Sequence, residues 1–136
     1  MIKYTEFKNS LEKTTNDFQP IFFAFSNEQY AEGIKKIGAS KDNKITSIGA
    51  GGYILSKDVK RFLSMCGTRK QRLKNYLKEP EQLKDALIYE LANHEFCITG
   101  DYTDAMEALN IKPDKMTKKS KKVLAEAINE YFTGVR

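Results

Sequence analysis

The densest set of side chains that could carry out chemistry comprises Glu90, His94, Glu95, Cys97 and Asp101. Glu90 and His94 are four positions apart, so a helix would place them on one face, and a zinc ion could draw on Glu90, His94 and Cys97. A zinc-protease helix needs a second histidine four residues after the first, but this chain has one His. We therefore expect no metal and no cofactor, and we interpret His94 as a structural side chain turned toward the core.

A cysteine nucleophile is the other chemical possibility. Cys97 lies three residues after His94, close enough on a helix for the imidazole to lower the pKa of the thiol. We find no third residue to orient the histidine and no oxyanion-stabilising feature. Cys66 shares an apolar face with Phe62 and Leu63, which favours a small core residue. We expect no catalytic residues, and hence a protein that is not an enzyme.

The segment Gly49-Ala50-Gly51-Gly52 resembles a phosphate-binding loop only in composition. Such a loop joins a strand directly to a helix N-terminus, where backbone N–H groups converge on the anion. Here Tyr53-Ile54-Leu55 intervenes, and no Gly-Lys-Ser/Thr follows. Glycines inside a strand more often mark a bulge or a close approach of another backbone, and this is our interpretation.

Charge is distributed in blocks along a chain with a net charge of +5. Lys57–Lys78 has eight basic residues and one acid, Asp85–Asn110 has six acids and no Lys or Arg, and Lys112–Lys122 has six lysines and one acid. Blocks of this kind either form a positive face for an anionic partner or neutralise one another between neighbouring helices. The candidate interaction surface is drawn from the first block: Lys57, Lys60, Arg61, Arg69, Lys70, Arg72 and Lys74.

Hydrophobic spacing predicts the elements of the first half of the chain. Helices are expected at about 3–15 and 27–37, the second with a capping box from Ser26 to Gln29 and a stop at Gly38. Pro20–Phe25 and Lys44–Leu55 are expected to be extended, the second with an interruption at Gly49–Gly52. Tyr30, Ile34 and Ile37 are expected to face inward.

The second half is expected to be helical. One helix starts at Ser56, with Leu63 among its inward side chains and a break at Gly67-Thr68. The next starts at Pro80 and stacks Leu83, Leu87 and Leu91. A short helix capped by Asp101 runs through Leu109, and Pro113-Asp114 opens the last one, with Leu124, Ile128 and Tyr131-Phe132 inward.

These elements predict an α+β fold over residues 1–136: one mostly helical domain with a small antiparallel sheet of two or three strands. No apolar run is long enough for a membrane span, and the first residues do not have the form of a secretion signal. The two cysteines fit reduced thiols. We therefore expect a cytoplasmic protein with no membrane partner; its oligomeric state is left open.

Three segments carry a resemblance to a known group: Tyr89–Asp101 with Ala105–Leu109, Phe23–Gln29, and Ile48–Tyr53. Together they resemble short uncharacterised proteins carried by phages and mobile elements of gut-type bacteria. The likeness covers about residues 20–110, and Asn93-His94-Glu95 is its most specific part. Small proteins of that origin often bind and block a host protein, and inhibitors of CRISPR nucleases are one such set.

The resemblance implies a non-enzymatic protein that inhibits a bacterial defence nuclease by binding the nuclease or its ribonucleoprotein in the host cytoplasm. The alternative is a small basic accessory protein that binds RNA or DNA through Lys57–Lys78 and Lys112–Lys122. The only aromatic residues within the first of these blocks, Phe62 and Tyr76, have core-facing spacing, which weakens base stacking as a mode of binding.

Overall fold

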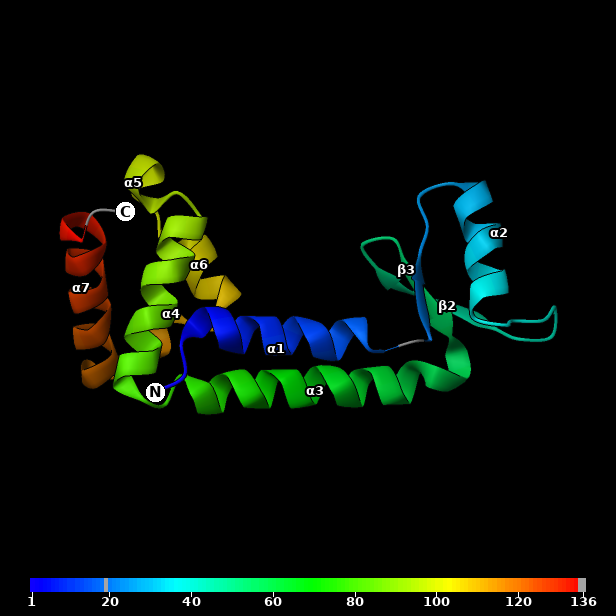
Figure 1. Ribbon diagram of the computed structural model, residues 1–136, viewed down its shortest axis with the longest axis horizontal. Helices are drawn as coiled ribbons and strands as arrows, with labels where there is room; N and C mark the ends of the chain where they lie inside the picture. Colours follow the sequence, from blue (N-terminus) through cyan, green and yellow to red (C-terminus); the bar gives the residue numbers. More distant parts are fainter. Residues whose placement is uncertain (19, 135–136) are drawn as a thin grey trace. The chain divides into compact units, whose positions relative to one another are not determined.

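The computed structural model describes residues 1–18 and 20–134. These residues form seven α-helices and one three-stranded antiparallel sheet, so the predicted α+β class is confirmed (Figure 1). The chain divides into two compact units, described here one at a time. Unit 1 consists of Met1–Ser10 and Lys70–Arg136, and unit 2 of Leu11–Arg69. The interpretation as a single domain stays a prediction. No described helix is long and apolar enough to cross a membrane.

Two long helices contribute residues to both units. α1 spans Tyr4–Asn16, close to the predicted range, and α3 spans Val59–Tyr76 without interruption after a 3-10 turn, η1 (Ser56–Asp58). The predicted break at Gly67-Thr68 is therefore wrong. A glycine inside a helix costs only about 1 kcal/mol relative to alanine, which a long helix with well-packed neighbouring residues tolerates.

The buried side of α3 is narrower than its sequence suggests. Phe62 and Cys66 are half-buried and Tyr76 is buried, but Leu63, predicted to face inward, is 62% exposed. Leu63 follows Phe62 by one position, about 100° around the helix. It therefore falls outside the strip that Phe62, Cys66 and Tyr76 define.

The sheet of unit 2 is built from β1 (Ile21–Phe23), β2 (Ile45–Gly49) and β3 (Gly52–Leu55), in the order β1-β3-β2. The segment 44–55, predicted to be extended with an interruption at Gly49–Gly52, is a hairpin whose turn falls at that interruption. Ala50 and Gly51 both have positive φ (52° and 78°), as the favoured two-residue hairpin turns require. The register between β2 and β3 shifts between Ser47 and Gly49, which fits a bulge or another irregularity at this point.

α2 (Asn27–Lys36) packs on the sheet through a helix position without a side chain. Phe22 of β1 lies directly against Gly33, where a Cβ would overlap its ring, and Tyr30 contacts Phe22 edge-on. Ile34 and Ile37 are half-buried as expected, but Tyr30 is 36% exposed. The rings of Tyr30 and Phe22 meet edge to face, and part of the Tyr30 ring remains in contact with solvent.

The predicted capping box of α2 is present in altered form. Ser26 Oγ accepts a hydrogen bond from the Gln29 N–H at 3.2 Å, and Gln29 Oε1 accepts one from the Phe25 N–H at 2.7 Å. The return bond therefore reaches one residue further back than in the usual motif. Gly38, with a φ of 70°, follows the helix and confirms the predicted stop.

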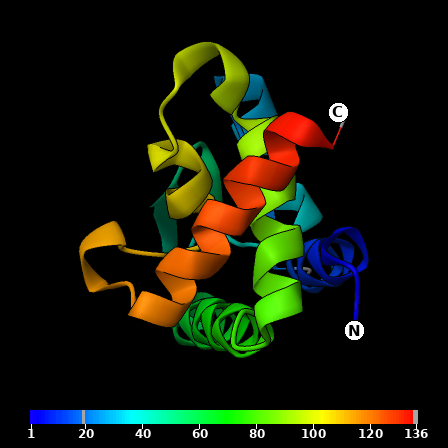
Figure 2. The same cartoon turned by 90° about the vertical axis from the view of Figure 1, so that its left-hand side faces the viewer.

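α4 (Pro80–Asn93) is the central helix of unit 1. Leu83, Leu87 and Leu91 are buried along it, as predicted. α7 (Lys118–Thr133) lies across α4, and the short α6 (Thr103–Ala108) packs beside it (Figure 2). The side chains by which α7 meets this core are Val123, Leu124, Ala127 and Tyr131.

Two helix starts in unit 1 differ from the prediction. Pro113 opens only a 3-10 turn, η2 (Pro113–Lys115), because Met116 is extended; α7 starts after Thr117, whose Oγ1 accepts the Ser120 N–H. An additional turn, α5 (Phe96–Thr99), is set off from α4 by Glu95, which has a positive φ of 55°. Sequence periodicity signals neither feature.

The contact between α2 and the sheet yields a paired stability test. Gly33→Ala would place a methyl group into the Phe22 ring, so we expect a loss of about 1–3 kcal/mol in the free energy of unfolding. Gly67→Ala is the matched control, because it adds the same methyl group to a helix position with open space around it. That change is expected to stabilise by up to about 1 kcal/mol. Urea unfolding of both variants measures the difference, and a stable Gly33→Ala protein would contradict the packing described.

Candidate functional site

The cluster of Glu90, His94, Glu95, Cys97 and Asp101 is not assembled into one site. Glu90 is buried, whereas Glu95, Cys97 and Asp101 are exposed and His94 is half-buried at the C-terminal end of α4. In the described part of the chain, no group of three or more His, Cys, Asp or Glu side chains is placed to hold a metal ion.

Cys97 and Asp101 each form hydrogen bonds with residues outside the cluster. The Cys97 N–H donates to Tyr131 Oη at 3.0 Å, and Asp101 Oδ1 accepts from the N–H and the hydroxyl of Thr103 at 2.8 and 2.6 Å. These bonds from Thr103 lower the pKa of Asp101. Asp101 thus assists the start of α6, much as predicted, although Tyr102 occupies the capping position itself.

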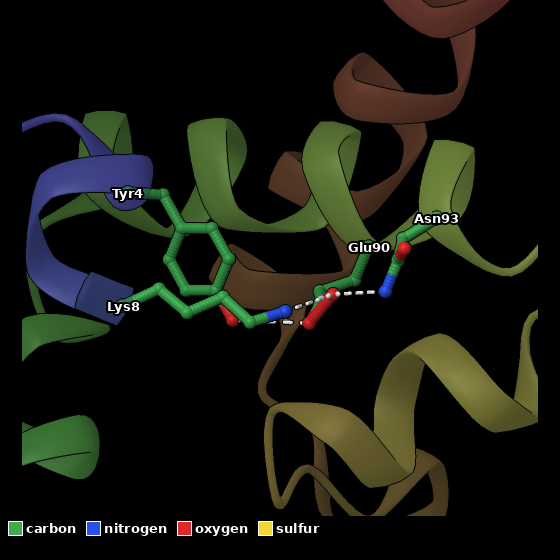
Figure 3. Close-up of polar contacts among 4 residues, drawn as sticks. All are labelled: Tyr4, Lys8, Glu90 and Asn93. Carbon is green, nitrogen blue, oxygen red and sulfur yellow. Dashed lines mark hydrogen bonds and ion pairs between the residues drawn. The ribbon is translucent and has the colours of Figure 1, made fainter. Parts of the chain in front are cut away.

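Glu90 points toward the start of α1, where Tyr4 and Lys8 lie (Figure 3). Its carboxylate accepts hydrogen bonds from Tyr4 Oη at 3.0 Å, Lys8 Nζ at 3.3 Å and Asn93 Nδ2 at 3.2 Å. Its side chain is 1% exposed, and a buried carboxylate of this kind is stable only when paired and hydrogen-bonded. Glu90 therefore holds the start of α1 against α4 and is not available as a general acid, base or metal ligand.

Further bonds hold the N-terminal segment in the same place. The Tyr4 N–H donates to Asp85 Oδ2 at 2.7 Å, and Tyr76 Oη donates to the carbonyl of Ile2 at 2.5 Å. Burial, with a contribution from Glu90, raises the pKa of Tyr4 above its ordinary value, and burial with Asp85 raises the pKa of Tyr76 to about 12. Both phenols are thus neutral donors at physiological pH.

The residues of the predicted interaction surface differ in their partners. Two of the arginines have partners elsewhere in their own unit. Arg61 pairs with Asp58 at 3.4 Å and lies over the ring of Phe18, which follows α1, and within unit 1 Arg72 donates to Ser10 Oγ of α1 at 2.9 Å. Arg69 is half-buried, and its Nε atom is buried without a hydrogen-bond partner.

The lysines of the same set are exposed. They are Lys57 in η1 and Lys60, Lys70 and Lys74 on the outer side of α3. Arg61 is exposed as well, whereas Arg69 and Arg72 are half-buried. The seven residues therefore differ in how accessible they are to a partner. Whether the lysines bind anything stays a prediction.

A groove in unit 1, between the N-terminal ends of α4 and α7, is the strongest candidate site. It has a volume of about 350 Å³. Its floor is made of apolar side chains, of which Leu83 and Val123 are buried and the others half-buried: Leu77, Pro80, Leu83, Ile111, Met116 and Val123.

Four exposed lysines form the rim of this groove: Lys78, Lys112, Lys115 and Lys119. No carboxylate lines it. Within residues 1–18 and 20–134, none of these four ammonium groups forms a salt bridge. We call the feature the lysine-ringed groove. The exposed acids Glu79 and Asp114 are sequence neighbours of Lys78 and Lys115 but do not line the groove. The rim is therefore positively charged, and an anionic ligand with apolar parts suits it.

The start of α7 adds to the positive potential at the groove. The helix has no acidic residue in its first turn, and Lys118, Lys119, Lys121 and Lys122 crowd its N-terminal end. That end already carries a partial positive charge, so each cation there is unfavourable by about 0.3–1 kcal/mol. These lysines therefore lower the stability of the first turn of α7, and a bound anion would offset that loss.

Sequence reasoning found half of this site. The Lys112–Lys122 block was recognised as strongly basic, and Ile111, Met116 and Val123 are interspersed with it. The other wall, at Leu77–Leu83, lies about 30 residues earlier, and no local pattern connects the two segments. The groove exists only because α4 and α7 lie side by side.

A family model described as "Family of unknown function (DUF7659)" matches residues 3–133. No curated protein and no solved structure matches the chain.

The Glu90 network leads to a prediction about stability. Glu90→Gln retains the shape of the side chain but removes the charge that Lys8 and Tyr4 contact, so we expect a loss of about 1–3 kcal/mol in the free energy of unfolding. Glu95→Gln, a change at an exposed acid, is the control and is expected to stay within about 0.5 kcal/mol of wild type. Denaturant unfolding compares them; equal stabilities would mean that Glu90 does not anchor α1.

Proposed function

Since the chain belongs to the DUF7659 family, whose function is unknown, we propose a role from its own surface: it is a non-enzymatic binding protein that docks an anionic partner in the lysine-ringed groove. The observation that carries the proposal is the uncovered apolar floor surrounded by four lysines that form no salt bridge within the described part of the chain. Apolar surface gains free energy when a partner covers it, and the lysines select a partner of opposite charge.

The dispersal of the chemically capable groups also supports binding rather than catalysis. The Glu90 carboxylate is already engaged by three donors, and it faces α1. Cys97 and Asp101 are exposed, and their hydrogen bonds in the described part of the chain are with Tyr131 and Thr103.

Capture from an extract of the native host tests the proposal. The bait is the full chain, compared with Lys112→Glu/Lys119→Glu in the groove and with Lys60→Glu/Lys74→Glu on exposed α3 positions. The two double variants change the net charge equally. We expect a stoichiometric protein partner with wild type and with the α3 variant, and at least a tenfold loss with the groove variant, because two attractive contacts become repulsive.

Other outcomes of the capture are informative. Equal retention by all three baits would contradict a role for the groove. Nuclease-sensitive capture that falls steeply with salt, and that the α3 variant loses, would favour the alternative of nucleic-acid binding through Lys57–Lys78.

A narrower form of the proposal rests on the resemblance to phage and mobile-element proteins. In this form the partner is a bacterial defence nuclease, such as a CRISPR nuclease or its ribonucleoprotein, and the protein inhibits it by occupying its surface. We expect stoichiometric inhibition of DNA cleavage in a purified assay, relieved by Lys112→Glu/Lys119→Glu. Full cleavage by the nucleases of the native host at saturating protein would remove the narrower form and leave the general one standing.

A further inference from the structure

We infer that the occupant of the lysine-ringed groove is an acidic segment of a partner protein that folds as a short amphipathic helix and inserts large apolar side chains into the floor. The inference rests on the proposed function, and it goes further by naming the chemical class of the partner. Three properties of the groove carry it: its size, the distribution of its charges and the chemistry of its floor.

The size of the groove fits side chains. An apolar cavity of about 150 Å³ holds one benzene molecule, so a volume of about 350 Å³ takes two large apolar side chains. Two anchors three or four residues apart on one helix face give this pattern, as in other cases where a helix binds in a groove.

The charges surround the floor. Lys78 comes from the connection between α3 and α4. Lys112 directly precedes η2, Lys115 is the last residue of η2, and Lys119 belongs to α7. A single-chain amphiphile has one charged end and would leave most of these lysines without a partner. A helix with carboxylates on both sides of its apolar anchors would reach lysines from all three segments.

The floor argues against nucleic acid as the occupant. Binding of single strands relies on aromatic side chains on which bases stack, and no aromatic side chain lines the groove. The aliphatic floor, with Leu77, Leu83 and Met116 among its members, would remain uncovered beneath a sugar–phosphate backbone. Aliphatic anchors from a peptide cover it.

The hydroxyl groups at the edge of the groove do not offer an alternative recognition chemistry. Thr117 Oγ1 accepts the Ser120 N–H at 3.1 Å, and Ser120 Oγ donates to the Thr117 carbonyl at 3.0 Å. Both are used in capping α7. Recognition is therefore left to the four lysines and to shape.

A peptide-display selection on the full chain tests the inference without assuming a sequence. Random peptides of about 15 residues, roughly four helical turns, are selected on the immobilised protein. We expect the enriched peptides to carry a net negative charge and two large apolar residues three or four positions apart. A synthetic fluorescent copy of the best peptide is then measured against wild type, Lys112→Glu/Lys119→Glu and Lys60→Glu/Lys74→Glu.

The expected result is at least a tenfold weaker affinity for the groove variant, no change for the α3 variant, and a comparable loss when the two apolar anchors are replaced by alanine. Enrichment without a charge bias, or equal binding by the groove variant, would overturn the inference. So would groove-dependent binding of oleate or of a single-stranded RNA, with no acidic peptide selected; in that case the groove would still be the binding site.

A second copy of the chain is the remaining alternative to a partner peptide in the groove, because the segment Asp85–Asn110 is itself acidic and carries the exposed Ile98. Light scattering coupled to size-exclusion chromatography separates this case. A dimer that the groove variant abolishes would overturn the inference. A monomer, together with the selected acidic peptides, would support it.

Discussion

A carboxylate with almost no contact to solvent lies where α1 meets α4, and the N-terminal part of unit 1 depends on it. Removing a charge from water costs several kcal/mol unless pairing and hydrogen bonds compensate. Glu90 meets that requirement with a phenol, an ammonium group and an amide. Because two of these donors, Tyr4 and Lys8, come from the first turns of α1, the carboxylate holds those turns against α4.

The partners of Glu90 could not be predicted from the sequence. Its spacing from His94 suggested a shared chemical site, yet its partners Tyr4 and Lys8 lie more than 80 residues earlier in the chain. Long-range pairing of this kind leaves no local pattern. The structure gives the positions of the side chains in this cluster. The expectation that they are structural rather than catalytic stays a prediction.

The elements were predictable where local forces decide them. Ser26 begins α2, Gly38 ends it, and the leucines of α4 face the core, because capping, backbone freedom and periodicity act over a few residues. Prediction failed where tertiary packing outweighs local preference. Gly67 lies inside a continuous helix, and Glu95 adopts a left-handed conformation that glycine would take more readily.

The candidate site shows the same division. Composition was enough to recognise the Lys112–Lys122 block, but not to separate lysines that border an apolar floor from lysines that are merely solvated. It also placed Arg72 in an interaction surface, whereas that side chain is half-buried and donates to Ser10 of α1. The aliphatic parts of long basic side chains pack well, so charge alone does not predict exposure.

The lysines at the start of α7 have an evolutionary consequence. Acidic residues are the favourable choice at that end of a helix, so random drift would tend to replace Lys118 and Lys119 by Asp or Glu with a gain in stability. The proposed binding role supplies a reason to retain lysine at Lys119, which lines the groove. Among relatives of this chain, an acidic residue at that position would mark proteins in which the proposed role is absent.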